Sequence, residues 1–253
     1  TQANTKAKAA NAQTALKNNK KQNAPSTDSG NGSGKSGNQD KYNKQRHFVE
    51  NAAHELQTPL AVCMNKLELL SEHPDCTEDQ LKEIAGLHQA LNGIIRLNKS
   101  LLLLSRIDNK QFPETRDICL NHLIHKILEG INDIYERKAL HLRVSEKESL
   151  VCTMNESLAT TLITNLIKNA YVHNYEKGDI GITISRRMLT ISNTGIDKTL
   201  DKELLFARFA SQSKQQESTG LGLAIVKSIV DLYSIRIDYQ YANGMHTFTL
   251  LFY

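Results

Sequence analysis

Apolar side chains recur at alternating spacings of four and three residues in the first patterned stretch of the chain. The positions that share this seam are Val49, Ala53, Leu56, Leu60, Cys63, Leu67 and Leu70. So sustained a heptad pattern predicts a long helix with one apolar seam. Pro59 lies inside it, and because proline removes a helix hydrogen bond, we expect a kink near residues 55–59. Residues 73–75, His-Pro-Asp, should end the helix.

A second helix is expected after Thr77, which is followed by Asp79 and Gln80 in a capping pattern. Its main stripe consists of Leu81, Ile84, His88, Leu91, Ile95, Asn98, Leu102 and Ser105. A second stripe runs beside it, at Leu87, Ile94 and Leu101. Two stripes form a face too wide for one partner helix. We therefore predict that the helical hairpin pairs with a second copy as a dimeric four-helix bundle.

Beyond Phe112 the pattern changes to short alternating stretches and shorter helices. Strands are expected near residues 118–120, 140–144, 149–153, 180–185, 188–192, 234–241 and 245–252, and helices at 121–138, 155–172 and 220–232. The last two strands should form a hairpin that turns at Asn243-Gly244. The fold class is therefore α+β, with the helical hairpin followed by a mixed domain.

The first 40 residues lack this patterning. They contain one Leu (Leu16) and no Ile, Val, Phe, Met, Tyr or Trp, and they are rich in Asn, Lys, Gln, Ala, Gly and Ser. A segment of this composition buries too little apolar surface to offset the entropy lost on ordering. We therefore expect a disordered basic tail and linker over residues 1–41.

The charge is divided unevenly along the chain. Residues 1–46 carry nine basic and two acidic side chains, a net of +7, whereas residues 47–253 carry 22 basic and 25 acidic ones, a net of −3. An acidic body gives no support for nucleic acid as a partner. We also expect no signal peptide and no membrane span in this sequence. Free thiols are expected at the four dispersed cysteines, Cys63, Cys76, Cys119 and Cys152.

His54 is the first candidate for chemistry. It follows Ala53, a seam position, and so stands on the flank of the expected bundle, with Glu55 beside it and Thr58 one turn on. An exposed His offers one neutral ring nitrogen as a nucleophile, and Glu55 is placed to accept the proton of the other. By itself a surface His beside Glu is most often a solvated pair, but the destabilising Pro59 in a good heptad points to a function.

Asn165 and Asn169 lie one turn apart on an expected helix, and His173 continues their face. Amide oxygens suit Mg²⁺ that also binds phosphate, although a polar surface pair is the commoner origin of such a spacing. Asn193 and Gly195 end a strand, where an amide is able to accept the amino group of adenine and where a plain turn is the alternative.

Gly220 and Gly222 open a helix after a long polar loop. Glycine lets the backbone approach phosphate closely, and a helix N-terminus favours anions. A single Gly-x-Gly is weak evidence, and the pattern matches neither a P-loop nor a dinucleotide fingerprint.

The order of these features resembles that of sensor histidine kinases. FVENAAHELQTPL at residues 48–60 resembles their H-box, and TNLIKNA at 164–170 resembles their N-box. ISNTG at 191–195 is similar to the G1 box, LFARF at 205–209 to the F-box, and STGLGLAIVK at 218–227 to the G2 box. The five motifs follow the family order over residues 42–253, and the H-box is the most specific.

The resemblance implies a dimerisation and phosphotransfer hairpin over residues 42–111. A two-layer α/β sandwich should follow over 112–253, an ATP-binding domain of the type shared by gyrase, Hsp90, histidine kinases and MutL. Mg-ATP would phosphorylate His54 with Glu55 as general base, and an Asp of a response regulator receiver domain would take the phosphoryl group. Thr58 would serve the reverse phosphatase reaction, and Asn169 would bind Mg²⁺. The nucleotide contacts implied are Asn165, Asn169, His173, Asn193, Gly195, Lys214, Gly220, Gly222 and Leu223.

Some residues depart from the family pattern. They are Asn193 for Asp and Asp197 for Gly in the G1 box, Ser218 for Gly in the G2 box, and Val172 for a basic residue after the N-box. Lys214, in the expected lid over ATP at residues 196–218, is assigned as a substitute phosphate contact. The alternative is a catalytically weak nucleotide-binding dimeric scaffold or a phosphatase-dominant member.

The resemblance also implies partners and a location. We expect a homodimer through residues 42–111 and a cognate response regulator. The chain would be the cytoplasmic portion of a bacterial receptor anchored in the inner membrane by N-terminal segments outside this sequence.

Overall fold

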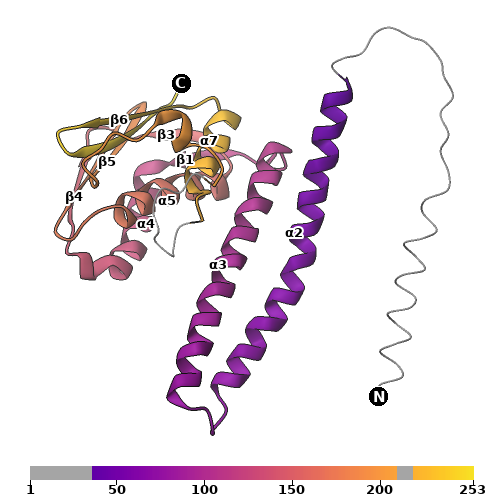
Figure 1. The fold of residues 1–253 in the computed structure, drawn as a ribbon. Coiled ribbons are helices and arrows are strands. Elements are labelled where there is room, and N and C mark those ends of the chain that lie inside the picture. Colours follow the sequence, from indigo (N-terminus) through magenta and orange to yellow (C-terminus); the bar gives the residue numbers. More distant parts are fainter. Residues whose placement is uncertain (1–35, 210–218) are drawn as a thin grey trace, which may run out of the picture. The chain divides into compact units, whose positions relative to one another are not determined.

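The computed structural model describes residues 36–209 and 219–253, with side chains placed from residue 51 onward (Figure 1). Of the described residues, 43–253 form one compact unit, and residues 36–42 belong to a separate one. Residues 1–35 of the expected tail lie outside the described residues, as does Lys214. No helix within the described ranges combines the length and apolar character needed to cross a bilayer.

Two long helices come first, α2 (Ser36–Ser71) and α3 (Glu78–Asp108). The helix α2 runs unbroken through Pro59. Thr77 caps α3, because its Oγ1 accepts a hydrogen bond from the Gln80 backbone N–H at 3.3 Å. In return, Gln80 Oε1 accepts from the Thr77 N–H at 2.9 Å. This reciprocal capping box is the helix start that the sequence predicts.

Much of the apolar surface of the hairpin is exposed in the single chain. Ala53 and Leu67 are buried, whereas Leu56 and Leu70 of the same seam are 50% and 54% exposed. On α3, Leu87 of the second stripe is 55% exposed. An extended exposed apolar surface is typical of an interaction site. The hairpin therefore has the surface that pairing with a second copy requires.

A five-stranded sheet forms one layer of the second domain, in the order β2-β4-β5-β7-β6. The strands are β2 (His141–Glu146), β4 (Asp179–Ser185), β5 (Met188–Thr194), β6 (Arg236–Ala242) and β7 (Met245–Leu251). Alternate residues of β4, β5 and β7 are buried, as the period of two predicts. Asn243 and Gly244 join β6 to β7 with φ angles of 53° and 77°, as a type I′ hairpin turn requires.

Three helices form the second layer on one face of this sheet: α4 (Leu120–Tyr135), α5 (Glu156–Val172) and α7 (Gly222–Leu232) (Figure 1). The helix α5 packs against α4, α7 and β5. The strands β1 (Arg116–Cys119) and β3 (Val151–Met154) pair antiparallel as a separate small sheet. This two-layer α+β arrangement confirms the fold class that the sequence predicts.

Three details differ from the sequence expectation. The helix α2 begins at Ser36, so residues 36–41 are helical and not part of a disordered tail. Leu120 is not in a strand but is the first residue of α4, where its side chain is fully buried and its N–H donates to the Leu150 carbonyl at 2.9 Å. A short helix, α6 (Lys202–Leu205), lies in a polar stretch that has no helical periodicity. Asp201 starts it by accepting a hydrogen bond from the Glu203 N–H at 2.9 Å, so a local cap rather than an apolar face defines it. The single-turn 3₁₀ helix η1 (Glu136–Lys138) follows α4.

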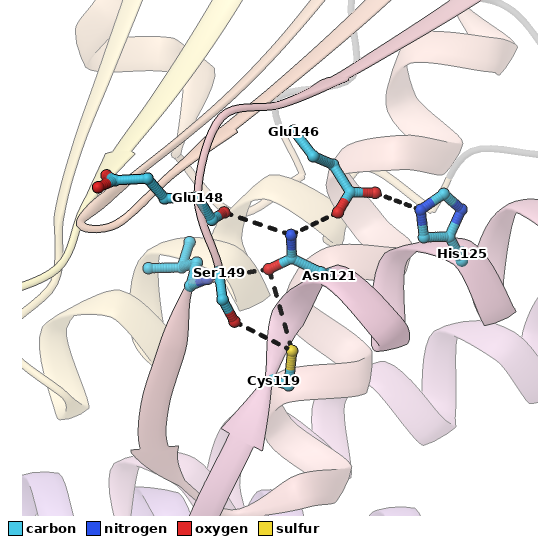
Figure 2. A network of polar contacts seen from close by, with 7 residues as sticks. Cys119, Asn121, His125, Glu146, Glu148 and Ser149 are labelled. Carbon is cyan, nitrogen blue, oxygen red and sulfur yellow. Dashed lines mark hydrogen bonds and ion pairs between the residues drawn. The ribbon is translucent and has the colours of Figure 1, made fainter.

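A polar network joins the start of α4 to the connection between β2 and β3 (Figure 2). The buried Asn121 donates from Nδ2 to Glu146 Oε2 at 2.7 Å and to the Glu148 carbonyl at 3.4 Å. Its Oδ1 accepts from the Leu150 N–H at 2.9 Å, and His125 pairs with the second carboxylate oxygen of Glu146. Both polar atoms of the buried amide therefore have partners.

Cys119 lies beside this network, at the N-cap position of α4 (Figure 2). Its pKa is lowered, chiefly because the His122 N–H and the Ser149 hydroxyl hydrogen-bond to the sulfur. The pKa of Cys152, on β3, is raised to about 11, mainly by burial and to a smaller extent by Asp117. Since the thiolate is the nucleophile, these two thiols should differ in reactivity.

Iodoacetamide at about pH 8 is expected to alkylate Cys119 at least about tenfold faster than Cys152, because more of Cys119 is thiolate. With rising pH the rate at Cys119 should level off first, while the rate at Cys152 should still rise at about pH 10. Peptide mass spectrometry over time measures both rates. Ser149→Ala removes one donor to the Cys119 sulfur and should slow its alkylation. Equal alkylation rates at the two thiols would contradict the difference in pKa between Cys119 and Cys152.

Candidate nucleotide-binding and phosphoacceptor site

His54, Glu55 and Thr58 have exposed side chains on α2, whereas the preceding seam residue, Ala53, is only 4% exposed. His54 and Thr58 lie one turn apart on the same helix face. Because Pro59 has no backbone N–H, the Glu55 carbonyl lacks its usual partner within the helix. The three side chains are therefore open to a reactant that approaches from solvent.

A buried Asn on α3 contacts the backbone next to His54. Asn98 is 5% exposed, and its Nδ2 donates to the Ala53 carbonyl at 2.6 Å. Ala53 directly precedes His54, so α3 as well as α2 determines where the imidazole is placed. Sequence reasoning includes Asn98 in the stripe of α3 but does not predict this contact.

One face of helix α5 is polar, and the faces on either side of it carry buried apolar side chains. Asn165 and Asn169 lie one turn apart on this face and are half-buried. Asn165 donates from Nδ2 to the Thr161 carbonyl at 2.8 Å, which turns its Oδ1 toward α7. An amide oxygen held in this way is a suitable partner for a hard cation.

The helix α7 begins beside Asn165. A Cβ atom at Gly222 would lie 2.9 Å from Asn165 Oδ1, so a larger residue here would push the Asn165 amide away from its present position. Gly220 has a φ of 67°, in the left-handed region that favours glycine. Leu223 is half-buried in the first turn of α7. The N-terminal N–H groups and the positive dipole end of α7 therefore face the polar side of α5, an arrangement that fits a phosphate group.

Asn193 and Gly195 lie at the end of β5. Asn193 is 2% exposed and donates from Nδ2 to the Thr194 carbonyl at 2.7 Å. With Nδ2 engaged, Oδ1 is the atom of this side chain that suits an amino group. A Cβ atom at Gly195 would lie 3.1 Å from the His173 carbonyl oxygen, so the end of β5 closely approaches the end of α5.

Lys138 closes the C-terminal end of α5. Its Nζ donates at 2.9, 2.8 and 3.0 Å to the carbonyls of Tyr171, Val172 and Asn174. These hydrogen bonds satisfy carbonyls at the negative end of the helix dipole. The pKa of His173 is lowered, mainly because the surrounding protein desolvates its charged form, and also because Lys138 and His246 lie near. The side chain reaches the surface, so solvent screens part of this effect.

Three of the predicted motifs thus meet around α5. The N-box and the G2 box meet where Asn165 faces Gly222, and the G1 box meets the end of α5, three residues beyond the N-box, where Gly195 faces the His173 carbonyl. His54 belongs to α2 and is outside this group. In the part of the chain that the structure describes, no group of three or more His, Cys, Asp and Glu side chains is arranged to hold a metal ion.

Sequence reasoning does not single out Lys138 or His246. Lys138 is one cation in a Glu-Arg-Lys run, and the carbonyls that it binds lie 33 to 36 positions along the chain. His246 occupies an inward position of β7, two residues before the buried Phe248. A His that interrupts an apolar alternation is the local signal that identifies such a residue.

Two family models match the chain. Residues 44–110, a range that includes His54, match the His Kinase A (phospho-acceptor) domain. Residues 154–252, a range that includes the three motifs around α5, match the histidine kinase-, DNA gyrase B-, and HSP90-like ATPase.

Similar proteins include the heme sensor protein HssS of Staphylococcus saprophyticus, 34% identical over 218 residues. That alignment covers 82% of this chain and 46% of the relative. HssS of Staphylococcus aureus is also 34% identical, over 215 residues that cover 81% of this chain and 46% of the relative. The chain therefore spans about half the length of the curated relatives that it matches.

Solved structures show the same fold. Full-length ShkA in complex with AMPPNP matches with a TM-score of 0.64 and 17% identity, over 82% of this chain and 46% of that chain. The Acinetobacter baumannii histidine kinase AdeS matches with a TM-score of 0.56 and 21% identity, over 78% of this chain and 95% of that chain.

Gly222→Ala is expected to lower the free energy of unfolding by about 1–3 kcal/mol, because the new Cβ overlaps Asn165 Oδ1. Urea denaturation measures the change. A Cβ atom at Gly130, in the interior of α4, would meet no neighbouring atom within 4 Å, and Gly130→Ala should instead stabilise the protein by about 1 kcal/mol. If both variants shifted stability in the same direction, the close approach of α7 to α5 would be wrong.

Proposed function

The chain belongs to the histidine kinase family, and we propose that it uses Mg-ATP to phosphorylate its own His54 and passes the phosphoryl group to a response regulator. In this proposal residues 42–111 dimerise and carry the acceptor histidine, and residues 112–253 bind ATP. Residues 1–41 are rich in basic side chains, and residues 36–41 of this stretch begin α2. The position of the phosphoacceptor family match and the site around α5 support these roles.

The observation that carries the proposal is the approach of Gly222 to Asn165. It sets the N-terminus of α7, which suits phosphate, against amide oxygens of α5, which suit Mg²⁺. A triphosphate bound between them would direct its adenine toward Asn193 and Gly195 at the end of β5. Leu223 and Gly220 would line the phosphate end, and Lys214 is proposed as a further phosphate contact.

The proposed reaction is a nucleophilic displacement at phosphorus. One ring nitrogen of His54 attacks the γ-phosphorus of ATP, a P–N bond forms, and the bond to the bridging oxygen breaks, so that ADP leaves with the electron pair. Glu55, the next residue, accepts the proton from the other ring nitrogen. The exposed position of both side chains allows a nucleotide carried by a separate domain to reach them.

Asn169 is the proposed protein ligand of Mg²⁺, with Asn165 beside it on the same face. Mg²⁺ is usually held by one or two protein oxygens together with phosphate oxygens and water, and it neutralises charge on the transferred group. The lowered pKa of His173 keeps this imidazole largely neutral near pH 7, so it would bind a phosphate or ribose oxygen as a hydrogen-bond donor rather than as a cation.

A carboxylate of a receiver domain is the proposed second acceptor. Its oxygen attacks the phosphorus, the P–N bond breaks, and His54 regains a proton while an acyl phosphate forms. In the reverse direction, Thr58 is proposed to orient a water molecule for hydrolysis of that acyl phosphate. Thr58 is exposed one turn from His54, on the surface where the receiver would dock.

Assembly and location are proposed from the same surfaces. The exposed leucines of the hairpin, which include Leu56, Leu70 and Leu87, would be buried by a second copy. Segments N-terminal to this sequence would anchor the protein in a bacterial inner membrane, with the chain on the cytoplasmic side.

The alternative function is a dimeric scaffold that binds nucleotide weakly, or a member in which the phosphatase reaction dominates. One observation favours it. Asn193 offers a neutral acceptor to adenine where a carboxylate would form a stronger, charge-assisted hydrogen bond, and its amide already donates to Thr194.

Labelled ATP with Mg²⁺ is expected to transfer an acid-labile label to the wild-type protein and none to His54→Gln, because the nucleophile is gone. Gel autoradiography after acid and base treatment measures the label. His73→Gln removes another exposed imidazole, which lies in the loop between α2 and α3, and should label like the wild type. A wild-type protein that binds ATP but never labels would exclude the kinase reaction.

Calorimetric titration with Mg-ATP is expected to show micromolar binding by the wild type. Asn193→Asp should tighten the Kd by about tenfold, because a charged acceptor adds about 1.4 kcal/mol. Asn65→Asp, an exposed amide on α2, is the matched control and should leave the Kd unchanged. No binding at about 1 mM Mg-ATP would instead support the scaffold alternative.

A further inference from the structure

The hairpin of β6 and β7 presents a row of polar rings beside the proposed adenine contact. In the sheet register His246 is opposite both Asn193 of β5 and Tyr241 of β6. His246 is 5% exposed and Tyr239, two residues from Tyr241 on the same face, is 1% exposed. Both side chains are therefore part of the protein interior, and their polar atoms bind other parts of the protein.

The three rings bind three points of the loop that leaves β5, residues 195–201. His246 Nε2 lies 2.9 Å from the Ile196 carbonyl oxygen. The Tyr241 hydroxyl donates to the Asp197 carboxylate. The Tyr239 hydroxyl accepts from the Leu200 N–H at 3.2 Å. The loop is thus held to the sheet along most of its length.

The hydrogen bonds select one tautomer of His246. A carbonyl only accepts, so Nε2 must carry the proton that is donated to Ile196. In the neutral ring Nδ1 is then an acceptor, and it lies 2.8 Å from the Tyr239 hydroxyl. Burial raises the pKa of Tyr239, so this hydroxyl keeps its proton and donates it to Nδ1. A continuous chain therefore runs from the Leu200 N–H through Tyr239 and His246 to the Ile196 carbonyl.

Gly195 fits tightly against the same ring. A Cβ atom at this position would lie 3.0 Å from His246 Cδ2 and 3.1 Å from the His173 carbonyl oxygen. The turn after β5 is thus enclosed between His246 on one side and the end of α5 on the other. Since Asn193 and Gly195 are the proposed adenine contacts, the ring of His246 determines where both can lie.

We propose that His246, oriented by Tyr239, is a positioning residue of the nucleotide site: it fixes the loop at residues 195–201 so that the adenine contacts are formed before ATP arrives. This inference rests on the proposed function, because it assigns these residues to the ATP site. Preformed contacts strengthen binding because less conformational entropy is lost when the ligand binds. The residue acts on nucleotide affinity and leaves the phosphoryl transfer step to His54 and Glu55.

The test compares His246→Leu, which removes both ring nitrogens, with His246→Gln, whose amide N–H can still reach the Ile196 carbonyl. We expect His246→Leu to raise the calorimetric Kd for Mg-ATP and the KM of autophosphorylation by about tenfold, with kcat within about twofold. His246→Gln should recover most of the affinity. Amide hydrogen exchange without nucleotide should be faster at residues 196–200 in His246→Leu, since the loop is released.

A hydroxyl deletion supplies a matched pair. Tyr239→Phe breaks the chain between Leu200 and His246 and should raise the Kd about three- to tenfold. Tyr233→Phe removes a hydroxyl that also accepts a backbone N–H, that of Asn155 at 3.0 Å, but at a different site. It should reduce thermal stability similarly and leave the Kd unchanged.

The outcomes separate this inference from the proposed function. A wild-type protein that binds no ATP overturns the proposed function and the inference with it. A wild type that binds ATP while His246→Leu and Tyr239→Phe bind it equally well overturns the inference alone. A similar rise in Kd for Tyr233→Phe would show that the effect is a general loss of stability, which also overturns it.

Discussion

The burial of α5 on three sides is the constraint on which the site depends. Contacts with α4, α7 and β5 bury the apolar faces of the helix, and the polar face that remains includes Asn165 and Asn169, with His173 at its end. Lys138 satisfies the carbonyls at its C-terminal end with three hydrogen bonds. The position of α5 is therefore fixed by its packing. The neighbouring segments approach it closely at their glycines, which have no side chain.

The close approaches around α5 explain why glycine occurs at particular positions. Gly222 meets an amide oxygen of Asn165, and Gly195 is enclosed by His246 and the end of α5. A methyl group at position 222 would press on the Asn165 amide oxygen, and one at position 195 would press on the His246 ring and the His173 carbonyl. Phosphate and adenine would then be bound at opposite ends of one polar face, by backbone groups at one end and side chains at the other.

The sequence predicts those features that repeat locally. The alternation of β4 and β5, the cap at Thr77 and the Asn243-Gly244 turn all depend on neighbouring residues, and the structure confirms them. It does not predict contacts between residues far apart in the chain, such as Lys138 with the end of α5 or His246 with Ile196. Leu120 shows how far local pattern can predict an element. An apolar residue between a strand and a helix fits the end of the strand or a buried first residue of the helix equally well. The order of the motifs names the site residues, but only the packing of α7 and β5 on α5 shows that Asn165 and Gly222, and His173 and Gly195, are neighbours.

The hydrogen bond from Asn98 to the Ala53 carbonyl has a mechanical consequence for the hairpin. A slide of α2 along α3 by half a turn would move that carbonyl by about 2.7 Å and leave a buried amide without a partner. Such a group costs about 1–3 kcal/mol, which corresponds to roughly a five- to 150-fold difference in population between the aligned and the displaced register. The hydrogen bond therefore favours one register of the two helices next to His54. A signal that slides α2 along α3 must supply at least the free energy lost when this bond breaks.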